Sequence, residues 1–180
     1  MAQDSIAGGT LKFVGKWTPK MREAFNIIAQ YWSKNGSYTT TVAKELVRKD
    51  QSIKFDAYGC YTYINNLHNL DVWIRESPAF AKRVGQAYDD LASEMNKHGS
   101  EITMEFVDAE PFGKILYEAE GKIKGVMGSN VLTPILEFQL TREKNFEYNS
   151  KNLRKFGYDL LAIDYDEETN RKPIVSVVYG

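Results

Sequence analysis

The sequence contains a single cysteine, Cys60, and only two histidines, His68 and His98, among its 180 residues. One cysteine excludes a disulfide framework within the chain and suits a reducing compartment. The three side chains do not have the spacing of a zinc site, so we expect no metal. No apolar run reaches the roughly 18 residues of a transmembrane helix. The first residues also lack the basic start and apolar centre of a signal peptide. The composition, with 43% hydrophobic and 26% charged residues, is that of a folded, soluble protein.

Signs of catalysis are equally scarce. No Gly-x-x-x-x-Gly-Lys loop is present to cradle phosphates, so we expect neither ATP binding nor another cofactor. Asp108, Glu118 and the triplet Glu120-Gly121-Lys122 resemble the acidic and lysine residues of metal-dependent nucleases. That triplet is common, however, and a nuclease carries it on a strand, whereas we expect it near a helix end. The sequence therefore predicts a protein that is not an enzyme.

The charge is small overall but unevenly distributed. The formal net charge is −1, which disfavours a protein that coats nucleic acid over its whole surface. Between Thr10 and Lys54 there are nine Lys and Arg residues and three acidic residues. Between Glu101 and Leu140 there are three lysines and seven acidic residues. Phosphate contacts need such a local basic region, so the first part of the chain is the expected nucleic-acid-binding part.

The first third of the chain predicts a series of short helices. Thr18 and Pro19 are a capping residue and a first-turn proline, and they begin a helix over Pro19–Ser33. A second helix is expected over Thr39–Lys49. A third is expected within Asp56–Leu67, with Ala57, Cys60, Ile64 and Leu67 on its apolar face. The opposite face then carries hydroxyls and amides, which are typical of a helix that contacts DNA bases, although a surface helix of unusual composition is an alternative. Those polar residues are Tyr58, Thr62, Asn65 and Asn69.

The remainder predicts further helices and a strand pair. Leu70–Glu76 is a short helix, and 78–97 carries a narrow apolar stripe that suits packing on another helix or another subunit. Ile102–Val107 alternates like a strand but also fits a continued helix. Helices are expected over 109–120 and 131–144, and 145–156 is expected to be a linker. Leu160–Tyr165 and Ile174–Tyr179 predict a β-hairpin.

Two segments resemble the small terminase subunits of tailed bacteriophages. The segment 72–81, with sequence VWIRESPAFA, resembles the tryptophan, acidic residue, proline and phenylalanine pattern that closes their DNA-binding domain. Residues 132–140, LTPILEFQL, followed by Asn145-Phe146-Glu147-Tyr148, resemble their leucine-rich helix and its following signature. The stretch before Trp73 is longer than in that family, so either Asp56–Leu67 or His68–Arg75 is the recognition helix.

The resemblance implies a mainly α fold. Its parts are a mobile basic arm (1–16), a helix-turn-helix DNA-binding domain (17–77), a helical oligomerisation domain (78–150) and a C-terminal β segment (151–180) that joins an intersubunit β-barrel. It also implies a ring of about eight or more subunits. Such a ring recognises the packaging start site on double-stranded viral DNA and regulates the ATPase and nuclease of the large terminase subunit, in the host cytoplasm. A dimeric helix-turn-helix transcription regulator is the alternative.

These expectations name two sets of residues. The expected DNA contacts are phosphate contacts from basic side chains and base contacts from the polar helix face: Lys16, Lys20, Arg22, Lys44, Arg48, Lys49, Lys54, Tyr58, Thr62, Asn65 and Asn69. The expected oligomerisation contacts are apolar residues of the two later helices: Phe80, Val84, Ala87, Leu91, Met95, Leu132 and Leu136.

Overall fold

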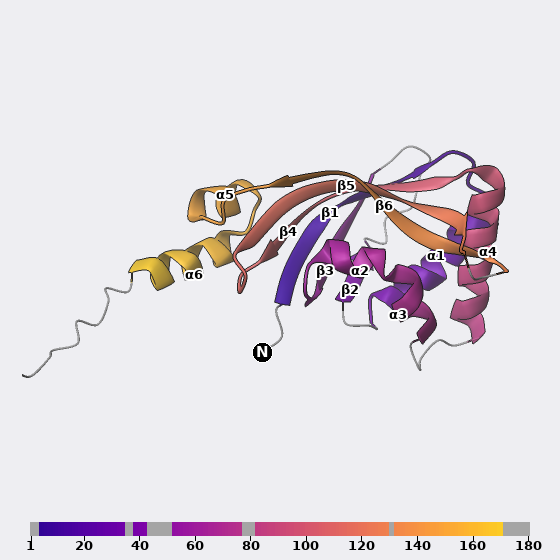
Figure 1. The fold of residues 1–180 in the computed structure, drawn as a ribbon, viewed down its shortest axis with the longest axis horizontal. Helices are drawn as coiled ribbons and strands as arrows, with labels where there is room; N and C mark the ends of the chain where they lie inside the picture. Colours follow the sequence, from indigo (N-terminus) through magenta and orange to yellow (C-terminus); the bar gives the residue numbers. More distant parts are fainter. Residues whose placement is uncertain (1–3, 35–37, 43–51, 77–81, 130–131, 171–180) are drawn as a thin grey trace, which may run out of the picture.

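A computed structural model of the chain describes residues 4–34, 38–42, 52–76, 82–129 and 132–170. Its centre is a six-stranded antiparallel sheet with strand order β2-β3-β1-β4-β5-β6 (Figure 1). The strands are β1 (Asp4–Val14), β2 (Tyr38–Val42), β3 (Ile53–Cys60), β4 (Glu101–Glu110), β5 (Ile115–Met127) and β6 (Pro134–Asn145). The helices are α1 (Pro19–Trp32), α2 (Tyr63–His68), α3 (Leu70–Glu76), α4 (Lys82–His98), α5 (Ser150–Lys155) and α6 (Asp159–Asn170).

The first four strands form a βαββαβ unit. Helix α1 connects β1 to β2, and α4 is the last helix before β4. The strand order β2-β3-β1-β4 with this connectivity is that of a ferredoxin-like, or split β-α-β, unit. Strands β5 and β6 then extend the sheet beyond β4 by two successive antiparallel pairings. This fold hosts many unrelated functions, so it does not by itself identify one.

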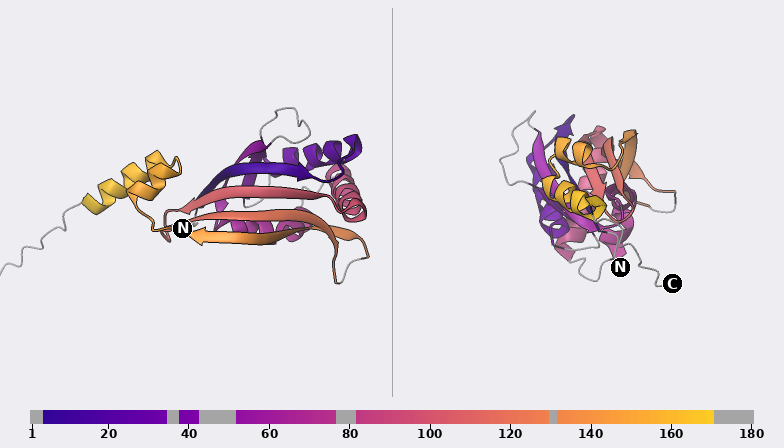
Figure 2. Two further views of the ribbon diagram at one scale, coloured as in Figure 1. Left: turned by 90° about the horizontal axis from the view of Figure 1, so that it is seen from above. Right: turned by 90° about the vertical axis from the view of Figure 1, so that its left-hand side faces the viewer.

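One face of the sheet is covered and the other is open. Along β3, Ile53, Phe55 and Ala57 are buried, whereas the alternate residues Lys54 and Asp56 are exposed. Side chains of a strand alternate between its two faces, so this pattern defines an inner and an outer face. Helices α1 to α4 lie against the inner face, and the open face is visible in the left view of Figure 2. The main core therefore lies between the sheet and these helices.

Local signals position the two long helices of the covering layer. The hydroxyl of Thr18 accepts a hydrogen bond from the Met21 N–H at 3.2 Å, and Pro19 occupies the first turn. The prediction of this helix is confirmed. Helix α4 approaches β5 closely, because a Cβ atom on Gly125 would lie 2.1 Å from the Ala92 carbonyl oxygen. Glycine is therefore required at this crossing, and it brings α4 onto the sheet.

Helix α2 is held at its start by a distant strand. Asp108 of β4 is fully buried, and its Oδ2 atom accepts a hydrogen bond from the Tyr63 N–H at 2.7 Å. The hydroxyl of Tyr117 donates to the same oxygen at 2.6 Å and accepts from the Ile64 N–H at 3.2 Å. These contacts satisfy two of the N–H groups that a helix start leaves without partners. The buried carboxylate thus connects α2 to β4 and β5.

The expected mainly α fold is wrong, because the described residues build a mixed α/β protein around the six-stranded sheet. The expected recognition helix over 56–67 divides into the end of β3, a turn, and the start of α2. Phe55, Ala57 and Gly59 are buried at every second position, and this strand period overrides the helical spacing. No helix-turn-helix is present in the part of the chain that the structure describes.

The expected helices over 109–120 and 131–144 are also wrong. The first range belongs to β4, its hairpin and β5, and the second belongs mainly to β6. Leu132, Leu136 and Leu140 are four residues apart, and a spacing of four fits a strand as well as a helix because it is a multiple of two. Phe138, buried between Leu136 and Leu140, decides for the strand.

The chain ends were also predicted wrongly. Residues 1–16 were expected to be a mobile arm, but Asp4–Val14 is the central strand β1. The expected strand Leu160–Tyr165 lies within α6, and the expected linker 145–156 contains α5. The second expected hairpin strand, Ile174–Tyr179, lies outside the described residues.

The predictions between the chain ends had mixed outcomes. The helix Leu70–Glu76 is confirmed as α3, and most of the helix expected over 78–97 is confirmed as α4. The helix expected over Thr39–Lys49 is wrong at its start, where β2 extends to Val42, and its remainder lies outside the described residues. Ile102–Val107 is a strand, within β4.

Candidate functional site

The residues expected to contact DNA bases are separated by the structure. Tyr58 lies on the open face of the sheet, and its hydroxyl donates to Asp4 Oδ2 at 2.8 Å. Thr62 is the N-cap residue of α2, and Asn69 is its C-cap residue. Asn65 is exposed on the same helix. The side chain of Asn69 donates to the Asn65 carbonyl oxygen at 2.7 Å and so caps the helix. Tyr58 and the two asparagines therefore do not share one polar helix face.

The expected phosphate contacts are similarly dispersed. Lys54 is exposed on the open face. Lys20 instead lies on α1 in the covering layer, where its Nζ atom is 3.8 Å from Asp90 Oδ2. Lys16 is exposed beyond the end of β1, and Arg22 is half-buried on α1. Lys44, Arg48 and Lys49 lie outside the described residues. The described members thus occupy both sides of the sheet.

Most residues expected at a subunit interface belong to the core of the single chain. Val84, Ala87, Leu91 and Met95 of α4 are buried, with exposed fractions of 9%, 4%, 1% and 1%. Leu136 is buried on the inner face of β6. Ala87, Leu91 and Met95 pack into the core between the helices and the chain's own sheet, and of these three only Ala87 also lines a groove on the surface. Leu132 is 98% exposed, and Phe80 lies outside the described residues.

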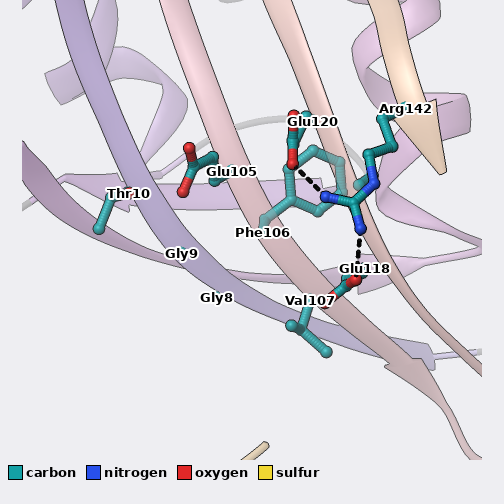
Figure 3. Close-up of a pocket in the computed structure, with 10 residues that line it drawn as sticks. Gly8, Gly9, Thr10, Glu105, Phe106, Val107, Glu118, Glu120 and Arg142 are labelled. Carbon is teal, nitrogen blue, oxygen red and sulfur yellow. Dashed lines mark hydrogen bonds and ion pairs between the residues drawn. The ribbon is translucent and has the colours of Figure 1, made fainter. Parts of the chain in front are cut away.

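The open face of the sheet has a hollow at its centre, about 250 Å³ in volume (Figure 3). Gly8 and Gly9 of β1 supply no side chains there, and Arg142 reaches in from β6. The guanidinium of Arg142 donates to Glu120 Oε1 at 2.7 Å and to Glu118 Oε1 at 3.4 Å. Glu105, opposite Glu120 in the register, also lines the hollow. Three carboxylates and one guanidinium make the hollow negative, so it repels a phosphate backbone.

Neighbouring charges on this face also compensate one another. The Oε1 atom of Glu101 lies 3.1 Å from Lys124 Nζ and 3.5 Å from Lys122 Nζ. Burial alone would raise the pKa of Glu101, but the two lysines outweigh it and hold this pKa below its ordinary value. Ladders of opposite charge across strands are what a solvated sheet face is expected to carry. The open face is therefore mainly a water-facing surface.

A groove runs between the outer sides of α1 and α4, with a volume of about 550 Å³. Ala24 and Ile27 of α1 and Ala87 of α4 form its apolar floor. Its rim carries three basic and two acidic side chains, which are Lys20, Lys82, Arg83, Glu23 and Asp90. The lining residues recur at helical spacing on both helices, so the groove follows the helix pair. Small floor residues allow a further helix to approach closely.

Residues 146–170, the last that the structure describes, form an arm with two helices, α5 and α6, that extends beyond the end of the sheet (Figure 1). Asn149 begins α5, because its side chain accepts a hydrogen bond from the Asn152 N–H at 2.9 Å. Gly157 ends α5 with a φ of 83°. Its N–H donates to the Arg154 carbonyl, and the Tyr158 N–H donates to the Leu153 carbonyl. This pair of bonds is a Schellman motif, which turns the chain sharply into α6.

A second, smaller core attaches the arm to the sheet. Ala109 and Leu116 from the strands pack with Tyr148, Leu153 and Ala162 from the arm. The hydroxyl of Tyr158 lies 3.1 Å from the Ile6 carbonyl oxygen and 2.9 Å from that of Val107. Burial, and to a smaller extent the nearby carboxylates, raise the pKa of Tyr148 to about 12.

Two hydrogen bonds to the carboxylate of Asp166 fix α6 against α5. Arg154 donates to Asp166 Oδ2 at 2.7 Å, and the Ser150 hydroxyl donates to Asp166 Oδ1. These two hydrogen bonds hold the pKa of Asp166 below its ordinary value. The side of α6 that carries Asp166 thus faces α5, and the opposite side is left outward.

The outward side of α6 is unusual for a surface helix. Leu160 is 77% exposed and Ile163 is 46% exposed, and Asp164 and Glu167 are exposed beside them. These positions are i, i+3, i+4 and i+7 of one helix, so they form one face. The helix contains five carboxylates and no lysine or arginine. The outward face of α6, defined by these four residues, is therefore apolar at its start and acidic at its end.

Sequence reasoning missed this arm. Two local signals could have found it, namely the capping Asn149 and the glycine at 157 that follows a basic helix end. The branched residues of α6 instead favoured a strand. The triplet Glu120-Gly121-Lys122 was expected near a helix end, and this is wrong, because it lies on β5. Asp108 is fully buried on β4 and caps α2, whereas Glu118 and Glu120 pair with Arg142 on the open face.

Comparison with protein-family models, curated proteins and solved structures finds no match to this chain. Within the described residues, no group of three or more His, Cys, Asp or Glu side chains is placed to hold a metal ion. None of the described helices has the length and apolar character needed to cross a membrane.

Proposed function

We propose that this protein is a subunit of a homo-oligomeric assembly, and that its C-terminal arm joins one copy to the next. The observation that carries this proposal is the outward face of α6, where Leu160 and Ile163 are exposed on a helix that projects beyond the sheet. Single exposed apolar residues are normal on a protein surface. Leu160 and Ile163 differ in lying together on one face of a helix that projects beyond the sheet, and this pair is the proposed contact site.

The arrangement of the whole molecule supports this role. The arm lies at one end of the long axis, and α1 and α4 lie at the other end (Figures 1 and 2). A contact that uses different surfaces of each copy produces a ring if the rotation closes and a filament if it does not. The arm is well suited to such a contact, because the second core and the Asp166 contacts hold it in a fixed orientation.

The finer role, recognition of viral DNA for packaging together with a large terminase subunit, stays a prediction from the resemblance. The helix-turn-helix that the resemblance implied is not found among the described residues, so DNA binding would require another surface. A dimeric transcription regulator loses the same support. Assembly of copies is common to the original expectation and to the geometry of the arm.

Native mass spectrometry of the full chain across a dilution series tests the proposal. We expect an oligomer that dissociates on dilution, and we expect the variant Leu160→Asp/Ile163→Asp to be a folded monomer at the same concentrations. The matched control is Glu137→Gln, an exposed change near the start of β6, whereas the arm follows the end of that strand. A full chain that is monomeric throughout the series would contradict the proposed function.

A further inference from the structure

We propose that the outward face of α6 binds in the groove between α1 and α4 of a second copy of this chain. This inference rests on the proposed function and names the receiving surface. Leu160 and Ile163 supply apolar side chains, and the groove floor of Ala24, Ile27 and Ala87 supplies an apolar site of about 550 Å³. A helix that lays one face into an apolar groove is recognised by anchors at i, i+3, i+4 and i+7, which is the spacing found here.

Charge identifies a second copy as the occupant. Helix α6 carries five carboxylates and no basic residue, whereas the groove rim has an excess of basic over acidic side chains. Lys82 and Arg83 are exposed on the rim near the start of α4, and Asp164 and Glu167 follow the two apolar anchors on α6. The acidic helix and the basic rim are complementary, and such complementarity fixes partner and register in an interface.

The arm cannot bind in the groove of its own copy, because the two lie at opposite ends of the molecule. The arm is attached to the end of the sheet by Tyr158, whose hydroxyl bonds the carbonyls of β1 and β4. The groove lies at the opposite end of the molecule, among α1 and α4 (Figure 1). The helix of one copy therefore reaches a groove only on another copy, and each copy offers one arm and one groove.

Charge exchange tests the contact directly. We expect Arg83→Glu in the groove and Glu167→Lys in the arm each to weaken assembly by about tenfold in dissociation constant. The double variant Arg83→Glu/Glu167→Lys restores an attractive pair, so it should recover most of that loss. Both residues are exposed, and circular dichroism and thermal unfolding check that each variant is folded. A double variant that assembles no better than the worse single variant would overturn the inference.

Mixing two defective copies gives an independent test. One copy carries Leu160→Asp/Ile163→Asp and keeps its groove, and the other carries Lys82→Glu/Arg83→Glu and keeps its arm. Each alone should be monomeric, and an equal mixture should form a one-to-one heterodimer, because it contains one intact arm and one intact groove. Failure of the mixture to associate would overturn the inference.

The outcomes separate the inference from the proposed function. A full chain that never oligomerises contradicts both. An oligomer that survives in both defective copies contradicts the arm-to-groove contact and also the role of the arm in the proposed function, and it leaves only assembly through another surface. Loss of assembly in the arm variant alone, with the groove variant unchanged, keeps the arm as the contact site and overturns the groove as its partner.

Discussion

The Asp108 carboxylate accepts a hydrogen bond from the backbone N–H of Tyr63, at 2.7 Å, across 45 residues of sequence. A buried acid on a central strand thus caps a helix that belongs to the covering layer. Helix α2 has only six residues, and its own N-cap residue, Thr62, makes no side-chain capping bond. The cap from β4 is therefore what fixes the start of this helix against the sheet.

Replacement of Asp108 measures the contribution of this cap. We expect Asp108→Ala to lower the free energy of unfolding by about 3–5 kcal/mol, because the Tyr63 N–H and the Tyr117 hydroxyl lose a buried acceptor. Asp108→Asn keeps one carbonyl oxygen, so its loss should be smaller. Urea unfolding followed by tryptophan fluorescence provides the measurement. Glu105→Gln, exposed on the same strand, is the control and should change stability by less than about 0.5 kcal/mol.

Two adjacent glycines of β1 offer a matched pair. A Cβ atom on Gly9 would lie 2.0 Å from the Glu105 carbonyl oxygen and 2.7 Å from the Phe106 Cα. One on Gly8 would lie 3.4 Å from Asp56 Oδ1 and 3.8 Å from the Phe55 carbonyl oxygen, which are ordinary contact distances. Backbone atoms of the neighbouring strand cannot move aside without breaking the pairing. We expect Gly9→Ala to cost more than about 3 kcal/mol or to prevent folding, and Gly8→Ala to cost less than about 1 kcal/mol. Equal thermal stability of the two variants would contradict this account.

Acid should loosen the arm before it unfolds the sheet. The pKa of Asp166 is lower in the folded protein than in the unfolded chain, because Ser150 and Arg154 donate to its ionised carboxylate. Its contribution to stability is therefore present above the unfolded pKa, about 3.9, and is lost as the pH falls through the folded pKa. Hydrogen exchange of α6 at falling pH should show this loss, and Asp166→Asn should remove the pH dependence while weakening the arm at neutral pH.

Alkaline pH should weaken the attachment of the arm to the sheet. Burial is the main reason that the pKa of Tyr158 is raised above its ordinary value, and the carboxylates of Asp108 and Asp56 raise it further. A raised pKa favours the neutral hydroxyl in the folded state, so this stability is present below the unfolded pKa, about 10, and is lost as the pH rises through the folded value. Tyr158→Phe should lower the free energy of unfolding by about 1–2 kcal/mol at neutral pH. In a pH titration above about pH 10, the free energy of unfolding of this variant should fall less steeply than that of the unchanged protein.

Substitutions on two separate surfaces test whether the protein binds DNA, and through which surface. Lys54 lies on the open face and Asn65 on a helix of the covering layer, so one short DNA segment cannot contact both. If α2 reads bases, Asn65→Ala should weaken specific binding by about 1–3 kcal/mol and leave non-specific binding unchanged. If the open face binds phosphates, Lys54→Ala should weaken all DNA equally and reduce the salt dependence. Fluorescence anisotropy with both variants distinguishes these cases, and no change in either would remove DNA from both surfaces.

The sequence identified elements that depend on local chemistry. Helix α1 follows from Thr18 and Pro19, and α3 and α4 follow from helical periodicity in segments that pack as amphipathic helices. The strands were missed where period four and period two coincide, as between Leu136 and Leu140. They were also missed where two glycines interrupt the alternation of buried residues, as in the middle of the central strand β1. The cap from Asp108 to Tyr63 is invisible in sequence because it joins residues that only the completed sheet brings together.

The angle at Gly157 has a consequence for the size of an assembly. Its φ of 83° sets the direction in which α6 leaves α5, and no atom lies within 4 Å of the position a Cβ would take. If the arm of each copy binds the groove of the next, the same angle is repeated at every interface. The number of copies that closes a ring then depends on this angle. The torsion at Gly157, together with the Asp166 contacts that hold α6 against α5, would then contribute to whether growth ends in a closed ring or continues as a filament.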